Sequence, residues 1–179
     1  MEIKIEDASI KYLDKLYELE MQCFTQEAFS RRQIAYLLTD YNAVGLIAKI
    51  NGEVVGFVIS QIEVEEDSVF GHIVTVNVAA SFRRKGIATK LLNETQTILK
   101  TRGIKQIRLE VRHNNSAAIK LYQHLGFKEI AKLEGYYGKE NDLNTLNKVT
   151  DKIMHEIADL TGKEYMHNHN QINQSKNLK

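Results

Sequence analysis

The chain has 179 residues, of which 43% are hydrophobic and 26% charged, and its formal net charge is +1 at pH 7. This composition predicts one soluble globular domain with a real core, with no nucleic-acid partner because the charges balance and no membrane span because no apolar run approaches roughly 18 residues. The single cysteine, Cys23, excludes an internal disulfide and favours a reducing, cytoplasmic location.

Strands and helices are predicted to alternate along the chain, because apolar residues recur with the period of a strand or of a helix in successive segments. Ser30 with Gln33 is typical of a helix capping box, and Asn51-Gly52 predicts a tight hairpin, since both residues tolerate positive φ. This order of elements predicts a mixed sheet with helices packed on it. In chain order we expect a strand at 3–5, helices opened by Ser9 and by Ser30, strands at 44–50, 54–60 and 71–80, a helix over 87–99, a strand at 104–112, a helix over 118–125 and a strand at 127–133.

The turn SFRRKG, residues 81–86, leads from a predicted strand into a predicted helix. The first backbone N–H groups of a helix have no partner within it, and Gly86 lets a ligand approach them closely. Arg83, Arg84 and Lys85 add positive charge. The turn therefore predicts a site for a phosphate or diphosphate; the alternative is a solvated basic loop that binds nothing.

Two motifs carry a resemblance to a known family. Arg83-x-x-Gly86-x-Ala88 resembles the pyrophosphate signature of the GCN5-related N-acetyltransferases (GNAT), and LEVRHNNSAAIKLYQHLGF, residues 109–127, resembles the family's second motif. Over residues 3–142 the chain is most similar to the RimI/Ard-type branch, which acetylates protein N-termini. The resemblance implies an α/β (α+β) GNAT fold: a central, mixed, mostly antiparallel sheet, splayed between strands 71–80 and 104–112, with flanking helices.

The resemblance also implies acetyl-CoA as the acetyl donor. Backbone amides from Arg84 to Thr89 would hold its diphosphate, and the backbone at Val76 and Val78 would pair with its pantetheine arm. The N–H of Val76 would also stabilise the oxyanion of the reacting carbonyl. The implied cofactor-binding set is Val76, Asn77, Val78, Arg83, Arg84, Lys85, Gly86, Ile87, Ala88, Thr89, Asn115 and Tyr122.

Three side chains are candidates for proton transfer when an amine attacks a thioester, a reaction that needs a neutral amine and a protonated leaving thiol. The resemblance implies Glu110 or His72 as the base, directly or through water, and Tyr122 as the acid that protonates the thiolate. Each has a structural alternative. Glu110 is also read as a strand carboxylate paired with Arg108 or Arg112, His72 as a satisfied histidine at a strand end, and Tyr122 as a core residue.

Substrate residues are implied by position within the motifs. Phe24 lies in the loop that would shape the pocket for the first substrate residue, and Tyr136 and Tyr137 would clamp the peptide backbone; the alternative for this tyrosine pair is a surface turn. His167 and His169 are a weak pair for a metal, so we expect no metal site.

The C-terminal segment departs from the family. Residues 142–161 place apolar side chains at helical spacing, so we predict an amphipathic helix in place of the family's last strand. This helix either packs on its own domain, residues 1–141, or docks on an auxiliary subunit or a second copy. Residues 162–179 are polar and predicted to be disordered.

The function predicted from these motifs is transfer of the acetyl group from acetyl-CoA to the α-amine of protein or peptide N-termini, directly in a ternary complex. Two alternatives stay open. One is acetylation of a small amine, such as a polyamine or an amino sugar. The other is a catalytically silent, CoA-binding regulatory subunit.

Overall fold

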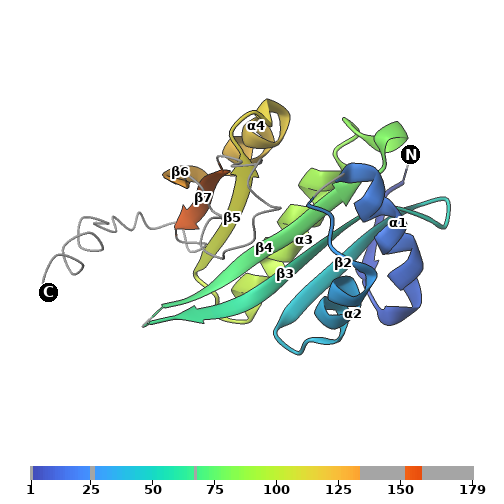
Figure 1. The fold of residues 1–179 in the computed structure, drawn as a ribbon, viewed down its shortest axis with the longest axis horizontal. Coiled ribbons are helices and arrows are strands. Elements are labelled where there is room, and N and C mark those ends of the chain that lie inside the picture. The colour runs from blue at the N-terminus through green and yellow to red at the C-terminus, as the bar shows by residue number, and fades with distance from the viewer. Residues whose placement is uncertain (1, 25–26, 67, 134–151, 159–179) are drawn as a thin grey trace, which may run out of the picture.

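A computed structural model describes residues 2–24, 27–66, 68–133 and 152–158 of the chain (Figure 1). Within these residues no helix has both the length and the apolar character needed to cross a membrane. The elements are β1 (Lys4–Asp7), a 3-10 turn (Ile10–Tyr12), α1 (Leu13–Cys23), α2 (Arg31–Thr39), β2 (Ala43–Ile50), β3 (Glu53–Glu65), β4 (Ser68–Val78), a 3-10 turn (Ala80–Phe82), α3 (Ile87–Thr101), β5 (Gln106–Arg112), α4 (Ser116–His124), β6 (Lys128–Leu133) and β7 (Lys152–Ala158).

The seven strands form one sheet in the order β1-β2-β3-β4-β5-β7-β6. Every neighbouring pair is antiparallel except β4 with β5. The mixed, mostly antiparallel sheet predicted from the sequence is confirmed, as is the predicted order of elements up to β6.

Local sequence signals account for two of the connections. Asn51 and Gly52 have φ of 51° and 83°, the positive values required by a two-residue hairpin turn between β2 and β3. At the start of α2, the Ser30 side chain accepts from the Gln33 N–H while the Gln33 side chain accepts from the Ser30 N–H, which completes the predicted capping box.

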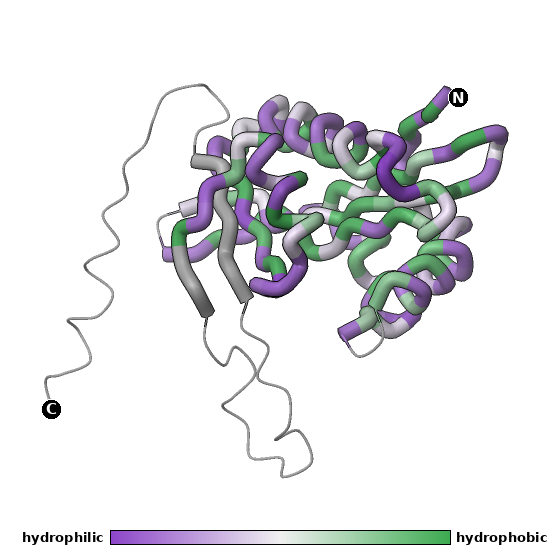
Figure 2. Tube along the Cα trace, turned by 90° about the horizontal axis from the view of Figure 1, so that it is seen from above, coloured by the Kyte–Doolittle hydropathy of each residue, from purple (hydrophilic) through white to green (hydrophobic). Residues whose placement is uncertain are grey.

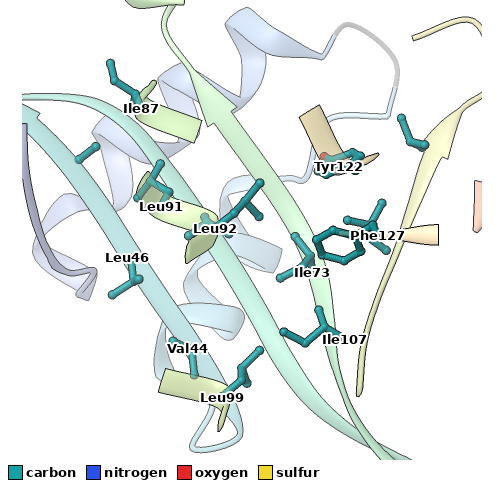
Figure 3. Close-up of a cluster of buried hydrophobic side chains, with 14 of the residues drawn as sticks. Val44, Leu46, Ile73, Ile87, Leu91, Leu92, Leu99, Ile107, Tyr122 and Phe127 are labelled. Carbon is teal, nitrogen blue, oxygen red and sulfur yellow. The ribbon is translucent and has the colours of Figure 1, made fainter. Parts of the chain in front are cut away.

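Two apolar cores lie on opposite faces of the sheet, because successive strand residues point to opposite sides. On β2, Leu46 and Ala48 belong to the core with α3 and α4, whereas Ile47 belongs to the core with α1 and α2. Figure 3 shows part of the first core, with Leu91 and Leu99 of α3 among its labelled side chains. Hydrophobic and hydrophilic positions alternate along the helices in Figure 2, as expected for helices that bury one side.

Strands β4 and β5 are neighbours over only a short stretch. Their parallel pairing joins Gly71 to Ile107 and His72 to Arg108, and beyond His72 the two strands diverge (Figure 1). The predicted splay is therefore confirmed. Among the described residues, the β5-facing edge of β4 after residue 73 pairs with no strand.

A β-bulge in β4 lies at the start of this divergence. Consecutive residues of β3 pair with Thr75 and Ile73, so Val74 is an extra residue on β4. A bulge bends its strand and shifts the alternation of side chains by one. As a result His72, Val74, Thr75 and Asn77 all belong to the sheet face that carries α1 and α2.

The helix predicted over 142–161 is wrong for residues 152–158, which form strand β7 between β5 and β6. Ile153 pairs with Val111 and Ile157 with Ile107. A spacing of four places residues on one face of a helix, but an even spacing also places them on one face of a strand. The open edges of β5 and β6 decide between the two, because β7 provides hydrogen-bond partners to both. The prediction that residues 152–158 dock on a partner as part of a helix therefore no longer applies.

The remaining C-terminal predictions concern residues 134–151 and 159–179, which lie outside the described residues. These ranges hold Tyr136 and Tyr137, the other parts of the predicted helix, and the tail that begins at residue 162.

Candidate functional site

The turn between β4 and α3 has the backbone geometry of an anion site. Arg84 and Gly86 both adopt positive φ, 61° and 77°, and the first hydrogen bond of α3 runs from Lys90 N to Gly86 O. The N–H groups of residues 87–89 therefore lie at the open end of the helix. A Cβ added at Gly86 would meet no protein atom within 4 Å, so the space beside these amides is open to a ligand. A diphosphate suits this donor set.

The basic side chains of the turn differ in their contacts. Arg83 Nε donates to the Val78 carbonyl at 3.1 Å, and its Nη2 lies 3.5 Å from Cys23 Sγ. Lys85 Nζ donates to the Ser81 carbonyl at 3.1 Å. Arg84 is exposed. Arg83 and Lys85 thus stabilise the turn itself, and all three add positive charge beside it.

The edge of β4 that follows the bulge carries three of the predicted cofactor-binding residues, and two of them, Val76 and Val78, were predicted to pair with the pantetheine arm. Val76 and Val78 are partly buried and pack on the α3 side. The Asn77 side chain is buried on the other face, where its Nδ2 donates to Glu20 Oε2 at 2.7 Å. Asn77 therefore has only its backbone to offer a ligand at this edge.

His72 and Glu110, predicted as alternative bases, are in direct contact. His72 Nε2 lies 2.8 Å from Glu110 Oε2, and on the other side of the ring Nδ1 lies 2.7 Å from Glu63 Oε1. The three residues come from β4, β5 and β3, and each faces the α1 and α2 side of the sheet. The result is one imidazole between two carboxylates.

The pKa of His72 is raised above its ordinary value of 6.5. Burial disfavours the charged ring, but the hydrogen bonds to Glu110 and Glu63 and their negative charges outweigh this cost. The imidazole is therefore a stronger base than a free histidine.

Two further ion pairs lie on this face. Arg108 Nη1 lies 2.7 Å from Glu65 Oε2, and Arg112 Nη2 lies 2.9 Å from Glu27 Oε2. Glu27 belongs to the α1–α2 loop, so this pair holds the loop beside the end of β5, on the face that carries Glu110.

Tyr122 is a core residue whose hydroxyl group can donate a proton. It is 6% exposed, and its ring meets that of Phe127 edge-on at 5.7 Å between centroids (Figure 3). Burial raises the pKa of the Tyr122 hydroxyl to about 12, so the group is protonated at neutral pH and can donate a proton. The packing reading is thus correct, and it is compatible with a catalytic one.

The two remaining described candidates lie at helix ends. Asn115 caps α4, with its Oδ1 accepting from the Ala118 N–H at 3.2 Å. Phe24 follows the last residue of α1 and is partly buried, with its N–H bonded to the Glu20 carbonyl. The capping bond engages one oxygen of Asn115 and leaves its amide nitrogen available to a ligand.

Sequence reasoning missed Glu63 and Glu20. Glu63 lies near the tip of the β3–β4 hairpin, and its even spacing from Gln61 and Glu65 was a signal that these residues share a face. Glu20 lies four residues after Leu16 and seven after Leu13, on the buried side of α1. That spacing was the available signal, because it places a carboxylate in an apolar row.

Comparisons with known proteins agree with this geometry. A model of the acetyltransferase (GNAT) family matches residues 13–127. An N-alpha-acetyltransferase of Sulfurisphaera tokodaii is 37% identical over 114 residues, which is 59% of this chain and 68% of the relative. The N-terminal acetyltransferase A complex catalytic subunit ard1 of Schizosaccharomyces pombe is 30% identical over 165 residues, 86% of this chain and 87% of that protein. The crystal structure of Ard1 from Thermoplasma volcanium has a TM-score of 0.75 at 22% identity, covering 89% of this chain and 99% of that chain.

Proposed function

The chain belongs to the acetyltransferase (GNAT) family, and we propose that it transfers the acetyl group of acetyl-CoA to the α-amine of protein or peptide N-termini. The observation that carries the proposal is the His72–Glu110 contact at the point where β4 and β5 part, on the strand that leads to an anion-binding turn. The single cysteine agrees with a reducing compartment, and we propose the cytoplasm as its location.

The donor side of the site is formed by β4 and the start of α3. Acetyl-CoA supplies the activated thioester carbonyl. The amides of residues 87–89 and the positive-φ turn at Arg84 and Gly86 would hold its diphosphate, and the open edge of β4 at Val76 and Val78 would pair with its amide-bearing arm. The amide nitrogen of Asn115, at the start of α4, would add a donor.

The base is proposed to be the His72–Glu110 pair. An α-amine with a pKa near 8 is mostly protonated at pH 7, so it must lose a proton before or during attack. The pair would accept this proton at His72 Nε2 or at the Glu110 carboxylate, directly or through water. Glu63 holds the Nδ1 side of the ring and so orients Nε2 toward Glu110.

Tyr122 is proposed to return a proton on the leaving-group side. As the C–N bond forms and the C–S bond breaks, the sulfur takes the electron pair and needs a proton. The Tyr122 hydroxyl is neutral at physiological pH because burial raises its pKa to about 12. A thiolate is stabilised when a neutral hydroxyl donates to it.

The acceptor side is proposed to be the α1–α2 loop, with Phe24 at its start. The support is the ion pair of Glu27 with Arg112, which holds this loop beside β5 on the face that carries His72 and Glu110. An extended peptide N-terminus between loop and sheet would bring its amine to the His72–Glu110 pair.

The test is incubation of the purified chain with acetyl-CoA, peptides of varied first residue, and polyamines, with product masses as the readout. Acetylation of peptide α-amines is expected. Acetylated polyamine without acetylated peptide would overturn the proposal, and CoA binding without any product would favour a silent subunit. Glu110→Gln should lower kcat by at least about 100-fold, whereas Glu65→Gln, on the same face and also ion-paired, should keep wild-type activity.

A further inference from the structure

Glu20 is a carboxylate in the core that the proposed chemistry does not use. It lies on α1 and is 0% exposed. Its Oε1 accepts from the backbone N–H of Phe29 at 3.1 Å. Its Oε2 accepts from Thr75 Oγ1 at 3.0 Å and from Asn77 Nδ2 at 2.7 Å. One side chain thus joins three segments: helix α1, the end of the α1–α2 loop, and strand β4.

The surroundings of Glu20 are unfavourable for its charge. Burial raises the pKa of the Glu20 carboxyl, and the hydrogen bonds from Phe29, Thr75 and Asn77 lower it only in part. All three donors are neutral. Burying a carboxyl group in an apolar core costs free energy that its hydrogen bonds offset in part, and an apolar side chain would pack there without this cost.

The three donors show what the carboxylate connects. Thr75 and Asn77 flank Val76, on the stretch of β4 whose other edge is open for the donor. Phe29 directly precedes Ser30, the N-cap of α2, and so ends the loop that begins at Phe24. Glu20 therefore ties the far end of this loop to the donor strand.

The same loop has a second attachment on the opposite strand. Arg112 of β5 holds Glu27 through Nε and Nη2, at 3.1 and 2.9 Å. Residues 27–29 are thus fixed to β4 through Glu20 and to β5 through Arg112. These are the two strands that diverge, so residues 27–29 are held beside the point where donor and acceptor would meet.

We propose that Glu20 is a positioning residue that holds residues 27–29, the described part of the α1–α2 loop before α2, in the conformation that binds the acceptor peptide. This inference rests on the proposed function of the loop. Donor binding does not depend on Glu20, because β4 keeps its shape through its long ladder with β3. Loss of the Glu20 hydrogen bonds should therefore weaken binding of the peptide and leave binding of acetyl-CoA intact.

Two variants and one control test the role of the hydrogen bonds. Glu20→Leu removes all three hydrogen bonds at similar volume. Glu20→Gln keeps an acceptor for Phe29. Its amide nitrogen would face Asn77 Nδ2, so the Asn77 amide must flip, which turns Oδ1 toward the new donor; Oδ1 is buried and has no hydrogen-bond partner among the described residues. Thr95→Val is the matched control. Thr95 is also 0% exposed, but its hydroxyl bonds within α3, to Leu91 O at 2.9 Å.

The measurements are hydrogen exchange at the Phe29 amide, KM for an acceptor peptide, kcat, and the Kd of acetyl-CoA. Phe29 should exchange slowly in the wild type and in Glu20→Gln, and quickly in Glu20→Leu. We expect the peptide KM of Glu20→Leu to rise about tenfold, with kcat and the acetyl-CoA Kd within about twofold of wild type. Glu20→Gln should restore the peptide KM, and Thr95→Val should change only the melting temperature.

Several results would overturn the inference. Fast Phe29 exchange in the wild type would do so even if Glu20→Leu fails to fold. An unchanged peptide KM in a folded Glu20→Leu, or an equal rise in Thr95→Val, would do so as well. Failure of the wild type to acetylate any peptide would overturn the proposed function and the acceptor role together, while the exchange experiment would still report whether Glu20 holds the loop.

Discussion

Replacing Gly86 by alanine tests whether the donor's diphosphate lies on the turn before α3. Gly86 has a φ of 77°, and an added Cβ would meet no protein atom within 4 Å. The cost to the folded chain is therefore only that of a left-handed alanine, about 1 kcal/mol, or about 2–4 °C in melting temperature for a domain of this size. The Cβ would, however, occupy space beside the amides of residues 87–89. Loss of one amide–phosphate hydrogen bond costs about 2 kcal/mol, which predicts CoA binding about 30-fold weaker.

Gly103→Ala is the matched control for this experiment. Gly103 has a φ of 80°, its added Cβ also meets nothing within 4 Å, and it lies beyond the opposite end of α3. Both variants should lose the same stability in thermal unfolding. Only Gly86→Ala should bind CoA more weakly in calorimetric titration, and neither should affect turnover of S-acetylpantetheine, which lacks the diphosphate. Equal CoA affinity in the two variants would refute the placement of the diphosphate.

Three further predictions concern the catalytic candidates. Glu63→Gln removes one of the two carboxylates that raise the pKa of His72, so the acidic limb of kcat/KM should move to lower pH; an unmoved limb would separate Glu63 from the base. Tyr122→Phe removes the proposed proton donor, so kcat should fall at least about tenfold. Because the ring against Phe127 is kept, the melting temperature should change by less than about 4 °C. Because folding raises the pKa of His72, the protonated ring stabilises the fold. This stabilisation is fully present below pH 6.5 and is lost as pH rises through the folded pKa, so in urea unfolding His72→Gln should lose more stability at about pH 5.5 than at about pH 9; equal losses would contradict the His72 ion pairs.

The parts of the fold that sequence predicts well are those whose causes lie within a few residues. The Asn51-Gly52 turn and the Ser30–Gln33 capping box need only local backbone preferences and one short side-chain contact. The turn at Gly86 is of the same kind. The sequence predicted an anion site there from one glycine and three cations, and the positive φ of Arg84 and Gly86 supports that prediction.

The C-terminal strand could not be predicted in the same way. Ile153 and Ile157 are compatible with both periods, and the segment is a strand because β5 and β6 leave a position between them. That position exists only in the assembled sheet. The periodicity of residues 152–158 alone does not reveal this position between β5 and β6, which decides that the segment is a strand.

The site was predicted where it depends on motif positions and missed where it depends on packing across the sheet. His72 and Glu110 were found as separate candidates, but their contact depends on the pairing of β4 with β5. The buried Glu20 was missed because the groups that satisfy its carboxylate, at Phe29, Thr75 and Asn77, lie in other segments of the chain. The bulge at Val74 turns Thr75 and Asn77 toward Glu20, and a bulge has no signal in the sequence of β4 alone.

The position of β7 has a consequence for how the enzyme is made. Glu110 lies on β5, which pairs with β7 over its whole length but with β4 at only two positions. During synthesis, strands β1 to β4 and helices α1 to α3 can assemble as soon as they leave the ribosome. The partner that fixes Glu110 beside His72 is Met154 and its neighbours, which are translated long after β5. A nascent chain can therefore form the proposed donor-binding half early, whereas the proposed proton-transfer pair of His72 and Glu110 is completed only when β7 has been added.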